Sequence, residues 1–259
     1  MTRLFSCLAL MLLIFCSFAL LKKDKPVFYI IGDSTVRNGD GSGKNQQWGW
    51  GSFIAGYFDT TKVSVSNQAI GGRSSRTFIT EGRWERITAE LKKGDYVIMQ
   101  FGHNDAGPLD DTARARGTIP GIGEESKDIY NPITKKNETV HTYGWYMRKY
   151  IREAKAKGAI AIVCSPVPRD NWKEGKINRS TESYTKWAKD VAKEEQCFFI
   201  DLNDLIAIEY ETLGAEKVKA FFPADHTHTD KAGAELNASV VIRELKKISS
   251  IGLLQFLNK

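Results

Sequence analysis

The sequence predicts an α/β protein: a three-layer α/β/α sandwich in which helices cover both faces of a five-stranded, mostly parallel sheet of the flavodoxin-like kind. Three features predict this fold. Five short apolar runs have the length and composition of buried strands. Segments with helical periodicity precede the later runs. Polar, glycine-containing segments follow the first three runs, which is typical of the edge where parallel strands end and ligands bind.

In the first half of the chain, the first strand is expected at 27–31, a continuous apolar run that ends at Gly32. A shorter strand candidate follows at 63–65. A helix over about 84–93 then leads into the third strand at 96–101. This half therefore supplies three strands and the three polar segments that follow them.

In the second half, apolar side chains at helical spacing predict a helix that begins near residue 143 and stops at Gly158. The fourth strand is expected at 159–164. A further helix over about 181–195 precedes the fifth strand at 197–200. Apolar residues that step by four and three positions over 234–248 predict an amphipathic closing helix.

The chain of 259 residues is long enough for one large domain, which we expect over 21–259. Its content of 42% hydrophobic and 26% charged residues is that of an ordinary globular protein. Residues 106–142 are rich in Gly, Asp, Thr and Pro and too long for a plain connector. Because this stretch directly follows Asn104, we expect a loop insertion beside the site.

Residues 1–20 have a composition of their own. Arg3 is their only charged residue, and 8–21 is nearly all apolar but too short to span a bilayer comfortably. This pattern predicts a secretory signal peptide cleaved near Ala19, no membrane span after cleavage, and a secreted or periplasmic protein. An uncleaved anchor, or a cell-surface lipoprotein attached through Cys16, is the alternative.

Loss of this segment would leave two cysteines, Cys164 and Cys197, both in predicted strands. An oxidising compartment would allow them to pair, and small buried thiols are the other interpretation. Metal-type cysteine spacing is absent from the sequence, and His226 with His228 lacks a clear third zinc ligand. We therefore expect no metal and no cofactor.

The formal net charge of the chain is +6, and several arginines lie in or near the polar segments. Such a basic rim would attract an acidic substrate, although a solvated surface explains the same charge. Nucleic acid is not an expected partner, because the lysines are dispersed and the sequence has no nucleic-acid-binding motif. The sequence does not indicate an oligomeric state.

The chemistry expected at this edge is nucleophilic. Ser34 lies in a tight Gly-Asp-Ser turn after the first strand, where its hydroxyl can face solvent. A serine hydroxyl needs a base and a group that orients the base. His228 is the candidate base, and Asp225, three residues earlier, can reach its Nδ1. The sequence lacks a Gly-x-Ser-x-Gly elbow, which excludes the common α/β-hydrolase arrangement.

A tetrahedral intermediate would need hydrogen-bond donors for its negative oxygen. We expect an oxyanion hole formed by the backbone N–H groups of Ser34 and Gly72 and by the side-chain amide of Asn104. A plain turn at Gly72 and a loop-capping role for Asn104 are the alternatives when each is taken alone. Their joint occurrence with Ser34, Asp225 and His228 favours catalysis.

Five further side chains are candidates for substrate binding. Segment 46–50 is a candidate wall of the site, and its Trp48 and Trp50 could stack on sugar rings, or could anchor the core or a loop. Arg73 and Arg76 belong to the basic rim that an acidic substrate would meet. His226 stands beside the expected triad, and a packing role or a loop hydrogen bond is its alternative.

These motifs resemble the four conserved blocks of the SGNH (GDSL-type) hydrolases. Segments 69–77, 100–105 and 222–229 narrow the resemblance to rhamnogalacturonan acetylesterases, and it extends over about 26–245. The matching residues are Gly32, Asp33, Ser34, Gly72, Asn104, Asp225 and His228.

The resemblance implies a five-stranded parallel α/β/α fold, Ser34 as nucleophile, and no metal or organic cofactor. It also implies acetyl esters on galacturonic acid residues of pectin as substrates. Cys164 and Cys197 do not match the disulfides of the fungal members, and 116–121 looks like the bacterial relatives.

We therefore expect a secreted serine carbohydrate esterase that removes acetyl groups from a pectic, rhamnogalacturonan-type polysaccharide through an acyl-enzyme. The alternatives are an SGNH esterase acting on acetylated xylan, on small esters or on lipids, and a non-catalytic carbohydrate-binding protein. The polar character of 106–142 disfavours a lipase lid. Binding alone would not need a complete triad.

Overall fold

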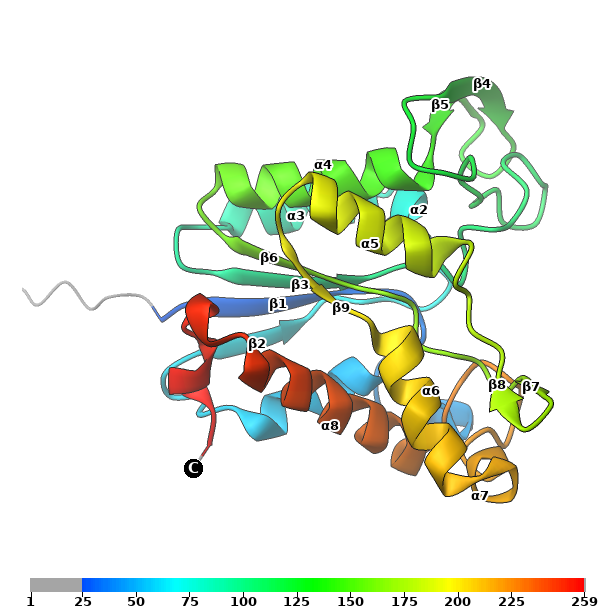
Figure 1. Ribbon diagram of the computed structural model, residues 1–259. Coiled ribbons are helices and arrows are strands. Elements are labelled where there is room, and N and C mark those ends of the chain that lie inside the picture. Colours follow the sequence, from blue (N-terminus) through cyan, green and yellow to red (C-terminus); the bar gives the residue numbers. More distant parts are fainter. Residues whose placement is uncertain (1–24, 259) are drawn as a thin grey trace, which may run out of the picture.

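The computed structural model describes residues 25–258, which form a three-layer α/β/α sandwich (Figure 1). Its central sheet has five strands in the order β2-β1-β3-β6-β9, and every pairing between them is parallel. This is the flavodoxin-like order, and the predicted fold class is confirmed. The strands are β1 (Val27–Gly32), β2 (Ser64–Asn67), β3 (Tyr96–Gln100), β6 (Ile160–Cys164) and β9 (Phe198–Ile200).

Helices cover both faces of the sheet (Figure 1). One layer contains α2 (Ser75–Thr80), α3 (Arg83–Glu90), α4 (Tyr143–Ala156) and α5 (Tyr184–Glu194). The other contains α6 (Leu202–Leu213), α7 (Ala215–Lys219) and α8 (Lys231–Lys247). The described chain also contains short 3-10 helices at Lys44–Gln46, Trp50–Ser52, Ile54–Tyr57, Ser249–Ile251 and Leu253–Phe256.

Each central strand contributes to two hydrophobic cores, because successive side chains point to opposite faces of the sheet. In β1, Phe28 and Ile30 pack with the α6 and α8 layer. Tyr29 and Ile31 pack with the opposite layer. Burial on both faces explains why the strand reads as an unbroken apolar run rather than an alternating one.

Gly32 ends β1 where two backbones approach closely. A Cβ at this position would lie 2.6 Å from the carbonyl oxygen of Gln100 on the adjacent β3 and 2.6 Å from Cγ2 of Val36. Any larger residue would therefore separate β1 from β3 or displace the turn that follows. The turn that carries Ser34 depends on this glycine for its position.

The five predicted strands and the predicted helices are present, with ends that differ by a few residues. The insertion at 106–142 is more ordered than expected, because it contains an antiparallel hairpin of β4 (Ser126–Asn131) and β5 (Lys136–His141). The Asn131 side chain closes the hairpin turn by accepting from the N–H groups of Ile133 and Thr134. Elements outside the predictions are α2, α6, α7 and the hairpin of β7 (Trp172–Lys173) and β8 (Lys176–Ile177).

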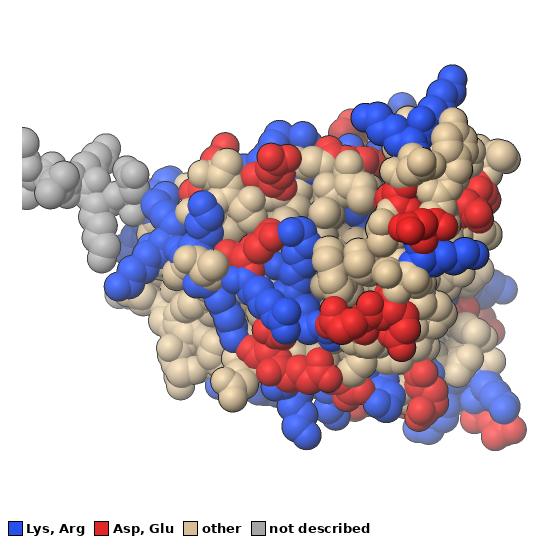
Figure 2. Space-filling view, turned by 90° about the horizontal axis from the view of Figure 1, so that it is seen from above, with Lys and Arg blue, Asp and Glu red and all other residues tan. Residues whose placement is uncertain are grey.

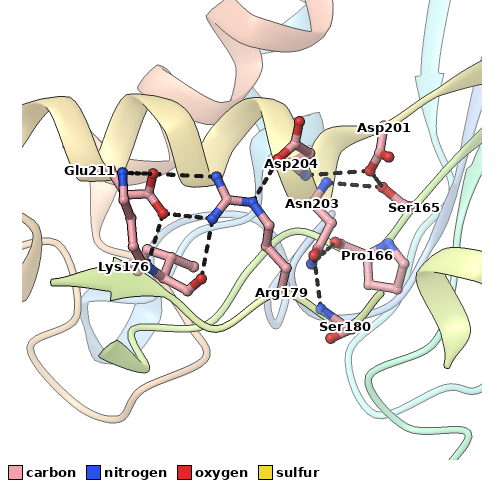
Figure 3. Close-up of polar contacts among 10 residues, drawn as sticks. Ser165, Pro166, Lys176, Arg179, Ser180, Asp201, Asn203, Asp204 and Glu211 are labelled. Carbon is pink, nitrogen blue, oxygen red and sulfur yellow. Dashed lines mark hydrogen bonds and ion pairs between the residues drawn. The ribbon is translucent and has the colours of Figure 1, made fainter. Parts of the chain in front are cut away.

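The segment between β6 and α5, which includes this second hairpin, is fastened to the first turns of α6 (Figure 3). Ser165 Oγ donates to Asp201 at 2.9 Å. Asn203 donates to the carbonyl of Pro166 at 2.9 Å and accepts from the N–H of Ser180 at 3.0 Å. The segment therefore leaves the sheet edge along a fixed path.

The predicted signal peptide at 1–20 lies outside the described residues. Within 25–258, no helix has both the length and the apolar character needed to cross a membrane. Cys164 and Cys197 are free thiols, so the interpretation in which they pair is not adopted. Cys164 is buried in β6 and packs as a small core residue.

Candidate active site

Three loops meet at the carboxyl ends of β1, β2 and β3. These strands are neighbours in the sheet, so the segments that follow them are placed side by side. Ser34 follows β1, Gly71 and Gly72 follow β2, and Asn104 follows β3. All four residues line one cavity of about 400 Å³. The other residues of its wall are Asn38, Gln47, His103, Arg114, Arg116, Arg169, Thr227 and His228.

The Ser34 turn is held by its neighbour Asp33. The Asp33 carbonyl accepts from the N–H groups of Val36 at 3.1 Å and Arg37 at 3.0 Å. Its carboxylate Oδ1 accepts from the N–H and the hydroxyl of Thr35 at 2.9 and 2.7 Å. This tight turn leaves Ser34 directed into the cavity with 8% of its surface exposed.

Ser34, His228 and Asp225 form a continuous hydrogen-bonded chain. Ser34 Oγ lies 2.8 Å from His228 Nε2, and His228 Nδ1 lies 2.7 Å from Asp225 Oδ2. Asp225 Oδ1 accepts from the N–H groups of Thr227 at 2.7 Å and His228 at 2.8 Å. Both oxygens of the carboxylate thus hold the histidine loop in one conformation.

Asp225 remains ionised over a wide pH range. Burial acts to raise the pKa of its carboxyl group, but the hydrogen bonds from the His228 side chain and from the backbone of His228 and Thr227 outweigh burial. The net effect lowers the pKa to about 2. A carboxylate in this state can orient the imidazole and stabilise a positive charge on it.

Donors for an anionic oxygen line the same cavity as the Ser34 hydroxyl. Within the described residues, the N–H groups of Ser34 and Gly72 donate to no protein acceptor. The Asn104 side-chain amide donates one hydrogen to the Arg73 carbonyl at 2.9 Å, which leaves its second hydrogen for a ligand. Gly72 has a φ of 79°, a left-handed conformation that glycine adopts without strain.

Two of the predicted substrate-binding residues are buried, and these predictions are wrong. Trp50 is 1% exposed, and its indole N–H donates to Gln100 at 2.8 Å. Gln100 in turn donates to Thr35 at 2.6 Å, so Trp50 helps to hold the turn that carries Ser34. Arg76 has no exposed surface, because it pairs with Glu138 of the β4–β5 hairpin at 2.7 Å.

The other three candidates lie near the cavity without lining it. Trp48 is half-buried, and its ring packs on Phe53 at 5.2 Å. Arg73 pairs with Glu81 at 3.1 Å, its guanidinium donates to the Gly71 carbonyl at 3.0 Å, and its backbone carbonyl accepts from Asn104. His226 is exposed, with Nε2 3.1 Å from the Arg169 guanidinium.

Gln47, in the segment 46–50 that was expected to form a wall, lines the cavity, whereas His103 and Arg169 were not singled out from the sequence. Gln47 donates to Asp225 at 3.2 Å, and His103 is the middle residue of the Gly-His-Asn segment. Arg169 comes from the segment after β6, which no motif marks. The one feature of the sequence that could have indicated Arg169 is its position shortly after the carboxyl end of a predicted strand. Among residues 25–258, no group of three or more His, Cys, Asp or Glu side chains is arranged to hold a metal ion.

Comparison with known proteins gives one family and several relatives. Residues 30–236 match the model of the GDSL-like lipase/acylhydrolase family. A rhamnogalacturonan acetylesterase of Emericella nidulans is 35% identical over 83% of this chain and 82% of its own length. A probable rhamnogalacturonan acetylesterase of Bacillus subtilis, YesY, is 33% identical over 85% of this chain and 92% of its own.

Solved structures show the same fold. The crystal structure of YxiM from Bacillus subtilis matches with a TM-score of 0.69 at 29% identity, and the match covers 87% of this chain and 57% of that one. Axe2, an acetylxylan esterase from Geobacillus stearothermophilus, matches with a TM-score of 0.58 at 18% identity, over 85% of this chain and 94% of that one. The second likeness is one of fold alone.

Proposed function

We propose, since the chain belongs to the GDSL-like lipase/acylhydrolase family, that it removes acetyl groups from pectic polysaccharide through a Ser34–His228–Asp225 triad. The chain is a carboxylic ester hydrolase, and its relatives support acetylesterase activity. The observation that carries the proposed triad is the unbroken hydrogen-bond chain from Ser34 Oγ through His228 to Asp225.

In the first half of the reaction, Ser34 Oγ attacks the acetyl carbonyl while His228 Nε2 takes the hydroxyl proton. Asp225 accepts a hydrogen bond from Nδ1 and stabilises the imidazolium that forms. The carbonyl oxygen becomes negative and is bound by the N–H groups of Ser34 and Gly72 and by the Asn104 amide. Collapse of this intermediate breaks the ester bond, and the imidazolium gives its proton to the departing sugar oxygen.

In the second half, a water molecule attacks the acetyl–Ser34 ester. His228 Nε2 takes a proton from this water, and the same donors bind the new oxyanion. The intermediate expels Ser34 Oγ, which recovers its proton from His228, and acetate leaves. Atoms balance as one ester and one water giving one alcohol and one acetic acid, with no redox change.

The pectic substrate is supported by relatives rather than by the triad. Two relatives at 35% and 33% identity are named as rhamnogalacturonan acetylesterases, one of them as probable. Any acetyl ester could react at Ser34, so the sugar must be chosen by the rest of the cavity wall. Acetylated xylan is the substrate class that a test has to separate from acetylated rhamnogalacturonan.

The test compares wild-type protein with Ser34→Ala on both polymers, with released acetate as the readout. Wild-type protein should release acetate faster from rhamnogalacturonan, and Ser34→Ala should reduce release by about 10³-fold or more while the circular dichroism spectrum stays unchanged. Comparable turnover by the variant would remove Ser34 from the mechanism. Faster release from xylan would overturn the pectic assignment and leave the triad intact.

Export is part of the same proposal, because pectic polymers are too large to enter a cell intact. The supporting feature is the apolar composition of residues 1–20 with its single Arg3. Expression of the full chain in its host should place the protein outside the cytoplasmic membrane, with a new N-terminus near residue 20. Recovery of the chain in the cytosol with Met1 retained would contradict the proposal.

A further inference from the structure

The wall of the catalytic cavity carries three guanidinium groups, those of Arg114, Arg116 and Arg169. Among the described residues that line this cavity, none is an Asp or a Glu. The remaining polar wall is neutral, with Asn38 and Gln47 as its amide side chains. Positive charge therefore faces the same space as the Ser34 hydroxyl, and the carboxylates that act on Arg116, those of Asp33, Asp105 and Asp111, lie behind the wall rather than on it.

These arginines differ from most of the other arginines in the structure. Of the twelve in the described residues, seven form an ion pair with a carboxylate: Arg73, Arg76, Arg83, Arg148, Arg152, Arg179 and Arg243. The three in the cavity form none within residues 25–258. The nearby carboxylate of Asp111 accepts hydrogen bonds from the backbone N–H groups of Ala113, Arg114 and Ala115 rather than from a guanidinium group.

The cavity also contrasts with the outer surface. On the face covered by α3, α4 and α5, basic and acidic side chains are interspersed (Figure 2). Such mixing gives little net field at any one point, because neighbouring charges of opposite sign cancel. A site with three cations and no lining anion attracts an anionic ligand, and guanidinium groups suit carboxylates through paired N–H donors.

Two of the three guanidinium groups are held in place. Arg116 donates to the Gly72 carbonyl at 3.0 Å, which ties it to the loop proposed to bind the oxyanion. Burial and the neighbouring Arg114 lower the pKa of Arg116 from its ordinary value, and these effects outweigh the opposing attraction of the Asp105, Asp111 and Asp33 carboxylates. Arg169 lies against His226, and the adjacent Asp170 N–H donates to the His226 carbonyl at 2.9 Å.

We propose that Arg114, Arg116 and Arg169 form a carboxylate-binding subsite that holds a free uronate group beside the acetyl ester cleaved at Ser34. This inference rests on the proposed esterase function and adds a requirement to it. The ring that carries the acetyl group, or the ring next to it, must present an ionised carboxylate. Methyl esterification of that carboxylate removes its charge and weakens binding.

The test uses acetylated rhamnogalacturonan with free carboxylates and the same polymer after methyl esterification. The measured quantity is the ratio of kcat/KM for acetate release from the two polymers. In wild-type protein this ratio should exceed about ten, and Arg169→Gln and Arg114→Gln should each lower it severalfold, because each variant removes one of the three positive charges that face the carboxylate. Arg114 is exposed, so its replacement does not disturb the core.

The matched control is Arg86→Gln. Arg86 is also exposed and without an ion pair in the described residues, but it lies on α3 and does not line the cavity. This variant should keep the wild-type ratio. A ratio near one in wild-type protein, or an equal fall in Arg86→Gln, would overturn the subsite.

Turnover of p-nitrophenyl acetate separates the test of the esterase function from the test of the carboxylate-binding subsite. This neutral ester needs the triad and no uronate. Wild-type turnover together with a polymer ratio near one would overturn the subsite and leave the esterase function standing. Absence of turnover on this ester and on both polymers would overturn the esterase function, and the subsite would fail with it.

Discussion

Asp105 links the two loops that carry the proposed oxyanion donors. Its carboxylate Oδ1 accepts from the N–H of Ser75 at 3.0 Å and from the Ser75 hydroxyl at 2.5 Å. Ser75 begins α2 just after Gly72, and Asp105 directly follows Asn104. The side chain is fully buried, and burial raises the pKa of its carboxyl group to about 7, against the opposing effect of the Ser75 bonds.

This raised pKa predicts how Asp105→Asn changes stability with pH. Folding favours the protonated carboxyl, so its stabilising effect is complete below the ordinary pKa near 3.8 and is lost as the pH rises towards 7. The amide oxygen of the replacement side chain can still accept both Ser75 bonds. At pH 8 the variant should therefore unfold at a higher denaturant concentration than wild type. The difference between their free energies of unfolding should shrink by up to about 1.4 kcal/mol per pH unit as the pH falls from 7 to 4.

The control for this measurement is Asp128→Asn, which removes a carboxylate on the exposed face of β4. Its effect on the unfolding free energy should not follow the same pH curve. A pH-independent difference between wild type and Asp105→Asn would show that Asp105 does not change its ionisation between pH 4 and 8 in the folded protein.

Single residues also show what sequence reasoning can and cannot reach. Asp225 and His228 were predictable because their spacing of three residues already suits the bond between them. Ser34 was predictable because it lies in a Gly-Asp-Ser turn directly after a predicted strand, although its partner His228 is 194 residues away. Trp50 and Arg76 were assigned to the substrate surface, yet both are buried by partners far away in the sequence. Gln100 is 50 residues from Trp50, and Glu138 is 62 residues from Arg76. Burial of a polar side chain depends on such distant partners, which no local pattern reveals.

At the scale of elements, the β7–β8 hairpin is fastened to α6 by Arg179 (Figure 3). Its guanidinium lies 2.6 Å from Glu211 and 2.6 Å from Asp204. The Glu211 carboxylate also accepts from the N–H of Ile177 in β8 at 3.0 Å. This cluster, with Asn203, fixes the far end of the segment that carries Arg169 to the cavity.

We expect Arg179→Leu to loosen this attachment. The hydrogen bond from Arg179, partly opposed by burial, lowers the pKa of Glu211 to about 2. The ion pair therefore stabilises the fold fully above the ordinary pKa near 4.5, and this stabilisation is lost as the pH falls towards 2. The variant should lose roughly 1 kcal/mol of unfolding free energy at pH 7, a value discounted for solvent screening, and much less near pH 3.

Lys186→Leu provides the comparison, because the Lys186–Asp190 pair joins neighbouring turns of α5 on the surface. It should leave stability and proteolysis of the β7–β8 hairpin unchanged. Faster cleavage of residues 172–177 in Arg179→Leu, measured by limited proteolysis, would support the attachment. Equal cleavage rates in the two variants would contradict it.

The elements that sequence reasoning found are those with a strong pattern. The central strands are buried on both faces and read as apolar runs, and α4 and α8 show helical periodicity. The β4–β5 hairpin was missed because Ile129 and Val140 are its only buried apolar side chains. Helix α6 was missed because it begins directly after β9, with no intervening loop to mark a new element.

For the whole molecule, the sheet topology explains why the sequence predicted the position of the site but not all the residues of the cavity wall. Strand β1 lies between β2 and β3, so three loops that are distant in sequence must converge at one edge. That rule placed Ser34, Gly72 and Asn104 together. It gave no side-chain direction for the loops after β6, and the contribution of Arg169 therefore emerged from the folded chain alone.

The net charge of the whole chain and the arginines of the cavity predict a salt effect that depends on the substrate. The chain carries a formal charge of +6, and three guanidinium groups face the catalytic cavity. Added salt screens such attraction, with a Debye length near 10 Å at 0.1 M and near 3 Å at 1 M. Raising NaCl from about 0.02 to 0.5 M should lower kcat/KM severalfold on acetylated rhamnogalacturonan, chiefly through KM. The rates on p-nitrophenyl acetate and on neutral acetylated xylan should change far less, which controls for any effect of salt on the triad itself. An equal loss on all three substrates would mean that salt acts on the enzyme's chemistry or stability, and the cationic cavity would then have no part in recognising the polymer.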